Sequence, residues 1–273
     1  MNATEPMQGD EPESKRERLR TPYPSQRHQV IMDRLGSRGR VNVADVTVEL
    51  GVTGETIRKD LIELERRGFL RRVHGGAVPV GQLTYEPPVS DRLHNQREKR
   101  AIALAALRHL PDGGSVLIDA GSTTAELAGV FPNDRELLVY TNTLPIALSL
   151  VSKPALTVIM LGGRVRPVTL AGVDDWAARA LSEINVDVAF LGANAISIDR
   201  GLTTPDPAEA AIKRLMARSA RRRILLADHT KFGRVSLCKH ADLSDIHLLI
   251  TDSEMNESEL ESLRATGLEV ELS

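Results

Sequence analysis

The chain has 273 residues, which suits one large domain or two smaller ones, and its single cysteine, Cys238, excludes an internal disulfide bond or a cysteine metal cluster. No apolar run approaches the roughly 20 residues that a membrane span needs, and the N-terminus lacks the basic and apolar parts of a signal peptide, so we expect a soluble cytoplasmic protein. The net charge is −2, but residues 15–75 carry about +6 and the flanking segments about −4 each, which indicates either a polyanionic partner for the basic part or a solvated charged surface.

The N-terminal part of the chain begins with a polar segment. Residues 1–24 are rich in Glu, Pro, Ser and Arg, and we expect a disordered tail there. A helical pattern then begins near Ser25, and Gly36 and Gly39 are expected to end it. Asn42 is a suitable N-cap for a second helix.

A third helix and a hairpin complete this part. Gly51 is a natural C-cap for the second helix, and Thr53 is the N-cap of the third. The residues that must face inward on the third helix are Ile57, Leu61 and Leu64. Residues 69–80 then form a hairpin with its turn at Gly75–Gly76. Three short helices and a hairpin predict a winged helix-turn-helix domain at residues 25–80.

The outward face of the third helix and the hairpin carry the candidate DNA contacts. A recognition helix places small polar and basic side chains of its N-terminal end in the major groove. The candidates are Thr53, Glu55, Thr56, Arg58 and Lys59 on the helix and Arg71, Arg72 and His74 on the hairpin. The alternative is a solvated amphipathic helix beside a surface hairpin.

The rest of the chain alternates between strands and helices. Residues 81–95 contain two prolines and few apolar residues, which is typical of a linker. Within residues 96–273, short β-rich runs are separated mostly by helical stretches, and the runs are 115–119, 137–141, 156–161, 186–192, 223–228 and 247–251. This alternation predicts an α/β domain with a parallel sheet and helices on both faces.

One strand-to-helix turn in this domain is suited to binding an anion. The strand at residues 115–119 runs into Gly121-Ser122-Thr123-Thr124, which opens a helix. The free N–H groups and the dipole of a helix start favour an anion, and the hydroxyl groups add donors. Ordinary N-capping is the alternative explanation.

Further polar residues follow other strands. Asp228 and Lys231 come directly after one β-rich run, and Asn142 follows another. Because open α/β sheets place ligands at the carboxyl ends of their strands, Lys231 is a candidate for phosphate and Asp228 for sugar hydroxyl groups. A surface salt bridge is the alternative for the first pair.

Several of these motifs resemble the DeoR/GlpR family of repressors. In the N-terminal part, the spacing of Arg27, Ile31 and Leu35 and the stretches 53–61 and 70–77 resemble the family's DNA-binding signature, with Thr47 where the family usually has Ala. From Arg97 onward the chain resembles the family's sensor domain, and the matching stretches are 98–103, 119–124, 141–147, 191–194, 201–206, 209–213 and 228–233.

The resemblance implies a fold similar to ribose-5-phosphate isomerase and a phosphorylated sugar, or a sugar-like acid or polyol, that relieves repression of carbohydrate genes. The residues it implies for effector binding are Lys99, Asp119, Gly121, Ser122, Thr123, Thr124, Asn142, Asp228 and Lys231. The chain has Asp174 and Ala195 where the family usually has Gly, so the identity of the effector does not transfer directly.

An isomerase activity is the alternative to a repressor. Isomerases of this fold resemble the chain at a Gly-Ala-Asp-Glu loop, but here residues 192–195 read Gly-Ala-Asn-Ala, without a carboxylate to act as the base. The histidines lack ligand spacing. We therefore expect no enzyme activity, cofactor or metal, and operator DNA as the partner. We also expect a homo-oligomer, because one winged-helix module reads only a half-site.

Overall fold

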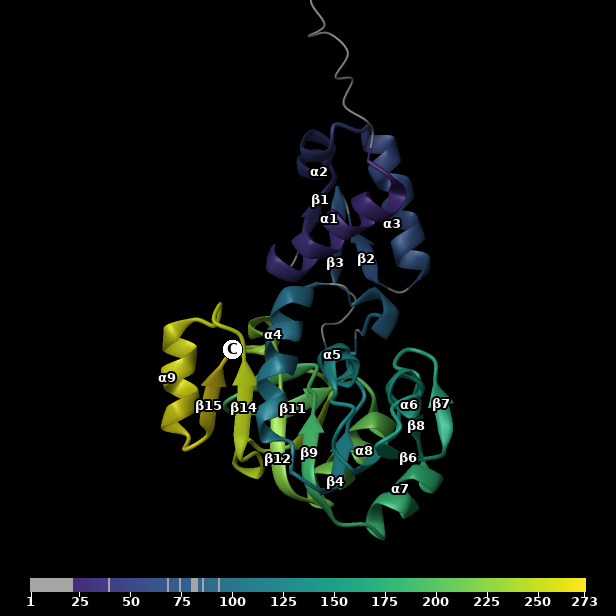
Figure 1. Ribbon diagram of the computed structural model, residues 1–273. Coiled ribbons are helices and arrows are strands. Elements are labelled where there is room, and N and C mark those ends of the chain that lie inside the picture. The colour runs from purple at the N-terminus through teal and green to yellow at the C-terminus, as the bar shows by residue number, and fades with distance from the viewer. Residues whose placement is uncertain are drawn as a thin grey trace, which may run out of the picture. The chain divides into compact units, whose positions relative to one another are not determined.

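The computed structural model describes residues 22–38, 40–67, 69–73, 75–79, 83–84, 86–92 and 94–273, and the chain divides into two compact units, residues 1–80 and 81–273 (Figure 1). The tail expected at residues 1–24 lies outside the described residues except for its last three, and a helix already begins at Pro24. Among the described helices, none is both long and apolar enough to cross a membrane.

The first unit contains three helices and a small sheet in its described part. Its elements are α1 (Pro24–Arg38), β1 (Val41–Asn42), α2 (Val43–Leu50), α3 (Gly54–Arg66), β2 (Leu70–Val73) and β3 (Gly76–Pro79). The strands pair antiparallel in the order β1-β3-β2. The expected winged helix-turn-helix architecture is confirmed, with β1 as a strand that the sequence pattern did not reveal.

The caps of this unit follow from its sequence. The side chain of Asn42 accepts a hydrogen bond from the backbone N–H of Ala44, and Gly51 ends α2 in the left-handed conformation that glycine adopts without strain. Of the two glycines expected to end α1, Gly36 lies inside the helix, which continues to Arg38, and Gly39 lies outside the described residues. A glycine inside a helix costs only about 1 kcal/mol relative to alanine, so Gly36 alone does not end α1.

The second unit is built on a seven-stranded parallel sheet in the order β15-β14-β12-β9-β4-β5-β6 (Figure 1). Its strands are β4 (Gly114–Ile118), β5 (Leu137–Thr141), β6 (Leu156–Met160), β9 (Val186–Leu191), β12 (Ala220–Leu226), β14 (Leu248–Thr251) and β15 (Glu269–Leu272). The expected parallel sheet is confirmed, and β15 extends it at one edge.

Helices cover both faces of this sheet. They are α4 (Gln96–Ala106), α5 (Ser122–Val130), α6 (Leu144–Val151), α7 (Asp175–Ser182), α8 (Pro207–Arg218) and α9 (Glu257–Ala265). Because successive strand residues point to opposite faces, Val116 and Ile118 of β4 pack with α4, α5 and α6, whereas Leu117 packs with the side chains of α7, α8 and α9.

Shorter elements flank the sheet at the ends of its strands. They are the antiparallel pair β7 (Arg164–Arg166) and β8 (Ala171–Val173), the antiparallel strands β10 (Ala195–Ser197), β11 (Gly201–Thr204) and β13 (Cys238–Ala241), and the 3-10 helices η2 (Val89–Asp91), η3 (Leu107–His109), η4 (His229–Lys231) and η5 (Leu243–Asp245). The sequence pattern indicated none of these strands.

The strand order reverses direction at β4. The chain passes from β4 to β5 and β6 on one side, whereas β9 and the later strands lie on its other side. Open α/β sheets form a ligand crevice at such a point, beyond the carboxyl ends of the two diverging strands. The turn after β4 leads directly into α5, so the helix start that the sequence singled out lies at this position.

Candidate functional site

The amino end of α3 presents the residues expected to read DNA. Thr53 caps the helix by accepting a hydrogen bond from the N–H of Thr56 at 3.2 Å, and the two hydroxyl groups lie 2.9 Å apart. Arg58 and Lys59 are exposed, and the guanidinium of Arg58 lies 3.9 Å from the exposed carboxylate of Glu55. Two cations on this helix are thus accessible to a polyanion.

The hairpin is tied to α3 through one of its own candidate residues. Arg72 pairs with the carboxylate of Glu65 at 2.5 Å and also donates its backbone N–H to it at 2.8 Å. These bonds lower the pKa of Glu65. Arg71 lies on β2, but its side chain and all of His74 are outside the described residues. Arg72 therefore connects the wing to the helix in addition to presenting charge.

A second ion pair fixes α1 against α3. The buried guanidinium of Arg27 donates to both oxygens of Asp60, at 2.6 and 2.9 Å, and this bond raises the pKa of Arg27. Both residues belong to stretches that resemble the family signature, and here they hold the first unit together.

The second unit has a crevice at the carboxyl ends of β4 and β9. Its lining combines the start of α5 with basic and amide side chains, and the lining residues are Arg92, Ala120, Gly121, Ser122, Thr123, Thr124, Gly192, Ala193, Asn194, Lys213, Leu226 and Lys231. The free volume is about 20 Å³, which is little more than a single water molecule occupies. Five residues expected at an effector site, Gly121 to Thr124 and Lys231, meet in this crevice.

The start of α5 offers hydrogen-bond donors to this crevice. The backbone N–H groups of Ser122, Thr123 and Thr124 have no acceptor among the described residues, as expected for the first turn of a helix. The hydroxyl of Thr124 donates to the carbonyl of Gly121 at 3.0 Å, whereas those of Ser122 and Thr123 have no partner within the described part. We call residues 121–124 the cradle.

Lys99 lies behind the crevice and does not line it. Its ammonium group donates to the backbone carbonyls of Arg92, at 3.0 Å, and His94, at 2.6 Å. Burial lowers the pKa of Lys99 to about 8, although the carboxylate of Asp228 opposes this shift. Lys99 therefore holds the loop that carries Arg92 into the crevice.

Asp228 and Lys231 are neighbours with different surroundings. The carboxylate of Asp228 accepts hydrogen bonds from the N–H of Thr230 at 3.1 Å and from the side chain of Asn95 at 3.2 Å. Burial opposes its ionisation, but the charge of Lys231, the hydroxyl group of Thr230, the charge of Lys99 and the amide of Asn95 outweigh burial and lower the pKa of Asp228. Burial also lowers the pKa of Lys231. Of this pair, only Lys231 lines the crevice.

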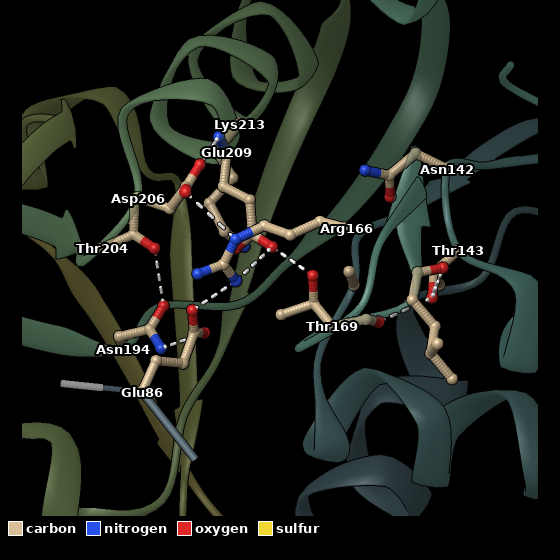
Figure 2. A network of polar contacts seen from close by, with 12 residues as sticks. Glu86, Asn142, Thr143, Arg166, Thr169, Asn194, Thr204, Asp206, Glu209 and Lys213 are labelled. Atoms are coloured by element: carbon tan, nitrogen blue, oxygen red, sulfur yellow. Dashed lines mark hydrogen bonds and ion pairs between the residues drawn. The ribbon is translucent and has the colours of Figure 1, made fainter. Parts of the chain in front are cut away.

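Asp119 and Asn142, which were also expected to bind the effector, instead bind other groups of the protein. Asp119 is buried, where it pairs with the ammonium group of Lys213 and accepts the N–H of Gly192 at 3.0 Å, so it stiffens the crevice wall. Asn142 donates to the carbonyl of Gly172 at 3.1 Å and does not line the crevice. Figure 2 shows its side chain apart from the polar cluster around Glu86.

The polar cluster around Glu86 was not predicted from the sequence. The carboxylate of Glu86 pairs with Arg92 at 2.5 Å. It also pairs with Arg166 at 2.6 Å and accepts a hydrogen bond from Asn194 at 2.8 Å (Figure 2). Arg166 also lies 3.1 Å from both Asp206 and Glu209. The members of this cluster come from several separate segments of the chain. Glu86 and Arg92 both belong to the expected linker 81–95, which is grouped with the second unit.

The two buried glutamates of this cluster differ in their electrostatics. Burial opposes the ionisation of Glu86, but Arg92, Asn194 and Arg166 outweigh it and lower the pKa of Glu86. Burial, together with the charge of Glu86, raises the pKa of Glu209. The charged form of Glu86 is thus the one that this cluster stabilises.

Comparison with known proteins identifies both units. Residues 27–82 match the family described as DeoR-like helix-turn-helix domain, and residues 94–253 match the DeoR C terminal sensor domain. The chain is 37% identical to the HTH-type transcriptional regulator GlpR of Haloferax volcanii, over 90% of this chain and 97% of that protein. It is 35% identical to a putative aga operon transcriptional repressor of Escherichia coli O157:H7, over 90% and 93%.

Among solved structures, ribose 5 phosphate isomerase A of Neisseria gonorrhoeae shares 15% identity with a TM-score of 0.37, covering 50% of this chain and 53% of that one.

Proposed function

Since the chain belongs to the DeoR family of transcriptional regulators, we propose that it represses genes of carbohydrate metabolism and that a phosphorylated sugar or sugar-like molecule relieves this repression. It is a regulator rather than an enzyme, because its matched domains and its relatives are those of transcriptional regulators. A relative named as a repressor supports the direction of the control. We propose that the protein acts in the cytoplasm.

The observation that carries the effector proposal is the convergence of free donors and cations in one crevice. The cradle offers unpaired N–H groups and two free hydroxyl groups at a helix start, where the helix dipole favours a negative charge. Arg92 and Lys231 reach the same crevice. A phosphate dianion needs several donors and a compensating positive charge, and this arrangement supplies both.

We assign operator binding to the first unit. The proposed contacts are Thr53, Glu55, Thr56, Arg58 and Lys59 on α3 and Arg71, Arg72 and His74 on the hairpin. The exposure of Arg58 and Lys59 at the amino end of α3 supports their placement in the major groove. Of the effector residues, we retain the cradle and Lys231 as direct contacts and assign Lys99, Asp119 and Asp228 to positioning.

The test of the cradle is a thermal-shift measurement on the full chain. Glycerol 3-phosphate and glucose 6-phosphate should raise the melting temperature more than glycerol and glucose do, since ligands that bind the native state stabilise it. Thr123→Val removes one free hydroxyl and should weaken this response. Thr157→Val, at an exposed threonine of β6, is the matched control. If the unphosphorylated compounds raise the melting temperature equally, the proposal that the cradle binds a phosphate group is wrong.

A further inference from the structure

The carboxylate of Glu86 occupies a position against the wall of the crevice. Its side chain is only 2% exposed, and its carboxylate contacts Arg92, Arg166 and Asn194. Two of those partners, Arg92 and Asn194, also line the crevice. Glu86 thus places a negative charge where the crevice offers positive charge and amide donors.

The crevice is too small for a sugar phosphate while this arrangement persists. Its free volume is about 20 Å³, whereas small-molecule sites are usually about 300–1,000 Å³. A sugar phosphate that uses the cradle and is enclosed by the crevice therefore displaces part of the wall. The cradle and the β9 end are built on a helix and a strand, and the β9 end is braced by Asp119 and Lys213.

The segment that carries Glu86 lies beside the wall and has no regular secondary structure, and its backbone is anchored where Arg92 donates to the carbonyl of Pro87 at 3.0 Å and the N–H of Val89 donates to the carbonyl of Val168 at 2.8 Å. Residues 86–88 form neither helix nor strand, and Pro87 and Pro88 have no N–H group to donate to a neighbour. The ion pairs of Glu86 are the main polar contacts that its side chain gives to the unit. If another anion pairs with Arg92 and Arg166, the segment loses these ion pairs.

The charges around Arg166 indicate what replaces Glu86. Arg166 faces three carboxylates, those of Glu86, Asp206 and Glu209, and the charge of Glu86 adds to the burial that raises the pKa of Glu209. If the carboxylate of Glu86 moves away and no other anion replaces it, the guanidinium groups of Arg92 and Arg166 lose this partner. Guanidinium forks bind carboxylate or phosphate groups in the same geometry, so an external anion is the chemical replacement.

We propose that Arg92 and Arg166 form a second anion subsite beside the cradle, which the Glu86 carboxylate occupies until an effector brings its own second anionic group. The effector class is then a phosphorylated sugar acid or a sugar bisphosphate, with its phosphate in the cradle. This inference rests on the proposed function.

The test compares ligands that differ in one group. Isothermal titration of the full chain measures 6-phosphogluconate against sorbitol 6-phosphate, 3-phosphoglycerate against glycerol 3-phosphate, and fructose 1,6-bisphosphate against fructose 6-phosphate. We expect the member with the second anion to bind about tenfold more tightly in at least one pair. The first two pairs report a carboxylate, and the third reports a second phosphate.

Variants assign the difference to the subsite. Arg166→Gln should reduce the difference within the responding pair to less than about twofold, whereas Arg164→Gln, at an exposed arginine two residues away on β7, should leave it unchanged. Glu86→Gln keeps the size of the side chain and one acceptor oxygen, but it replaces the other oxygen with an N–H donor and removes the competing charge. It should therefore tighten the binding of the two-anion ligand, which a Glu86 with a purely structural role does not predict.

The outcomes separate this inference from the proposed function. If both members of every pair bind equally and Glu86→Gln gains nothing, the second subsite is wrong while the phosphate cradle stands. If the phosphorylated compounds bind no better than gluconate, glycerol or fructose, both proposals are contradicted.

Discussion

At the scale of single residues, the DNA-reading assignment depends most on Arg58. Its side chain is exposed near the amino end of α3 and is held only loosely by Glu55. Arg58→Ala should weaken specific operator binding by about 1–3 kcal/mol if the side chain reads a base edge. The measurement is a binding titration on operator and on unrelated DNA of equal length.

Arg66 provides the matched control for that experiment. It lies at the far end of the same helix, is exposed, and pairs with Glu63 at 2.9 Å. Arg66→Ala should leave operator binding nearly unchanged. Equal weakening by Arg58→Ala on all sequences, with a shallower salt dependence, makes Arg58 a phosphate contact. No loss at all contradicts the placement of α3 in the groove.

Lys99 gives a prediction about pH. Its pKa of about 8 in the folded protein lies below the ordinary lysine value of 10.5. Between about pH 8 and pH 10.5, Lys99 binds more protons in the unfolded chain than in the folded protein. The contribution of Lys99 to the free energy of unfolding therefore increases as the pH rises from about 8. Urea unfolding at pH 7.5 and pH 9.5 should show wild type gaining stability relative to Lys99→Gln. A constant difference between the two proteins would refute this burial effect.

At this scale the sequence identified some site residues and could not identify others. The residues of the cradle follow one another in the chain, and their strand-to-helix context is local, so they were predicted directly. Glu86 and Arg92 lie in one segment, but their partner Arg166 comes from a distant part of the chain that only the fold brings to them. Asn142 occurs in a matching motif, yet its side chain turns to the carbonyl of Gly172.

At the scale of elements, the wing depends on a close approach at Gly76. A Cβ atom there would lie 1.8 Å from the backbone carbonyl oxygen of Val41, because β3 pairs with β1 at this position. Gly76→Ala should therefore force the two strands apart and cost about 2–4 kcal/mol, a large effect for one methyl group. Thermal unfolding of the full chain, with operator binding as a second readout, measures this cost.

Gly36 is the contrasting position. It lies inside α1, and a Cβ atom there meets nothing within 4 Å. Gly36→Ala should stabilise the first unit by about 0.5–1 kcal/mol, because alanine favours the helix. If both substitutions have similar effects, the β1–β3 contact does not constrain the wing.

The success of the element predictions followed the strength of the local signals. Helices α2 and α3 carry caps and apolar residues at helical spacing, and the central strands are apolar on both faces, so these elements were found. The short strands β1, β7, β8, β10, β11 and β13 have at most four residues each. Their pairing depends on partners that are far away in the sequence, so no local repeat of apolar residues predicts these strands.

At the scale of the whole molecule, we predict a homo-oligomer. Helix α6 exposes an apolar stripe of Leu144, Leu148 and Val151, which are 40%, 72% and 65% exposed. These residues recur at i, i+4 and i+7 and so share one face of the helix. Light scattering at micromolar concentration should give at least twice the chain mass of 29.8 kDa, and Leu148→Glu should lower it. A single-chain mass together with tight operator binding would contradict the prediction.

The central claim is that phosphate binding in the cradle releases DNA, and fluorescence anisotropy of a labelled operator tests it most directly. Glucose 6-phosphate, glycerol 3-phosphate and 6-phosphogluconate are each compared with the unphosphorylated compound, on wild type, Thr123→Val and Lys231→Ala. At least one phosphorylated compound should lower the operator affinity of wild type by about 5–150-fold, the range of a typical allosteric coupling. Both variants should bind the operator and fail to respond. Equal release by the unphosphorylated partners, or a normal response of both variants, would contradict the account.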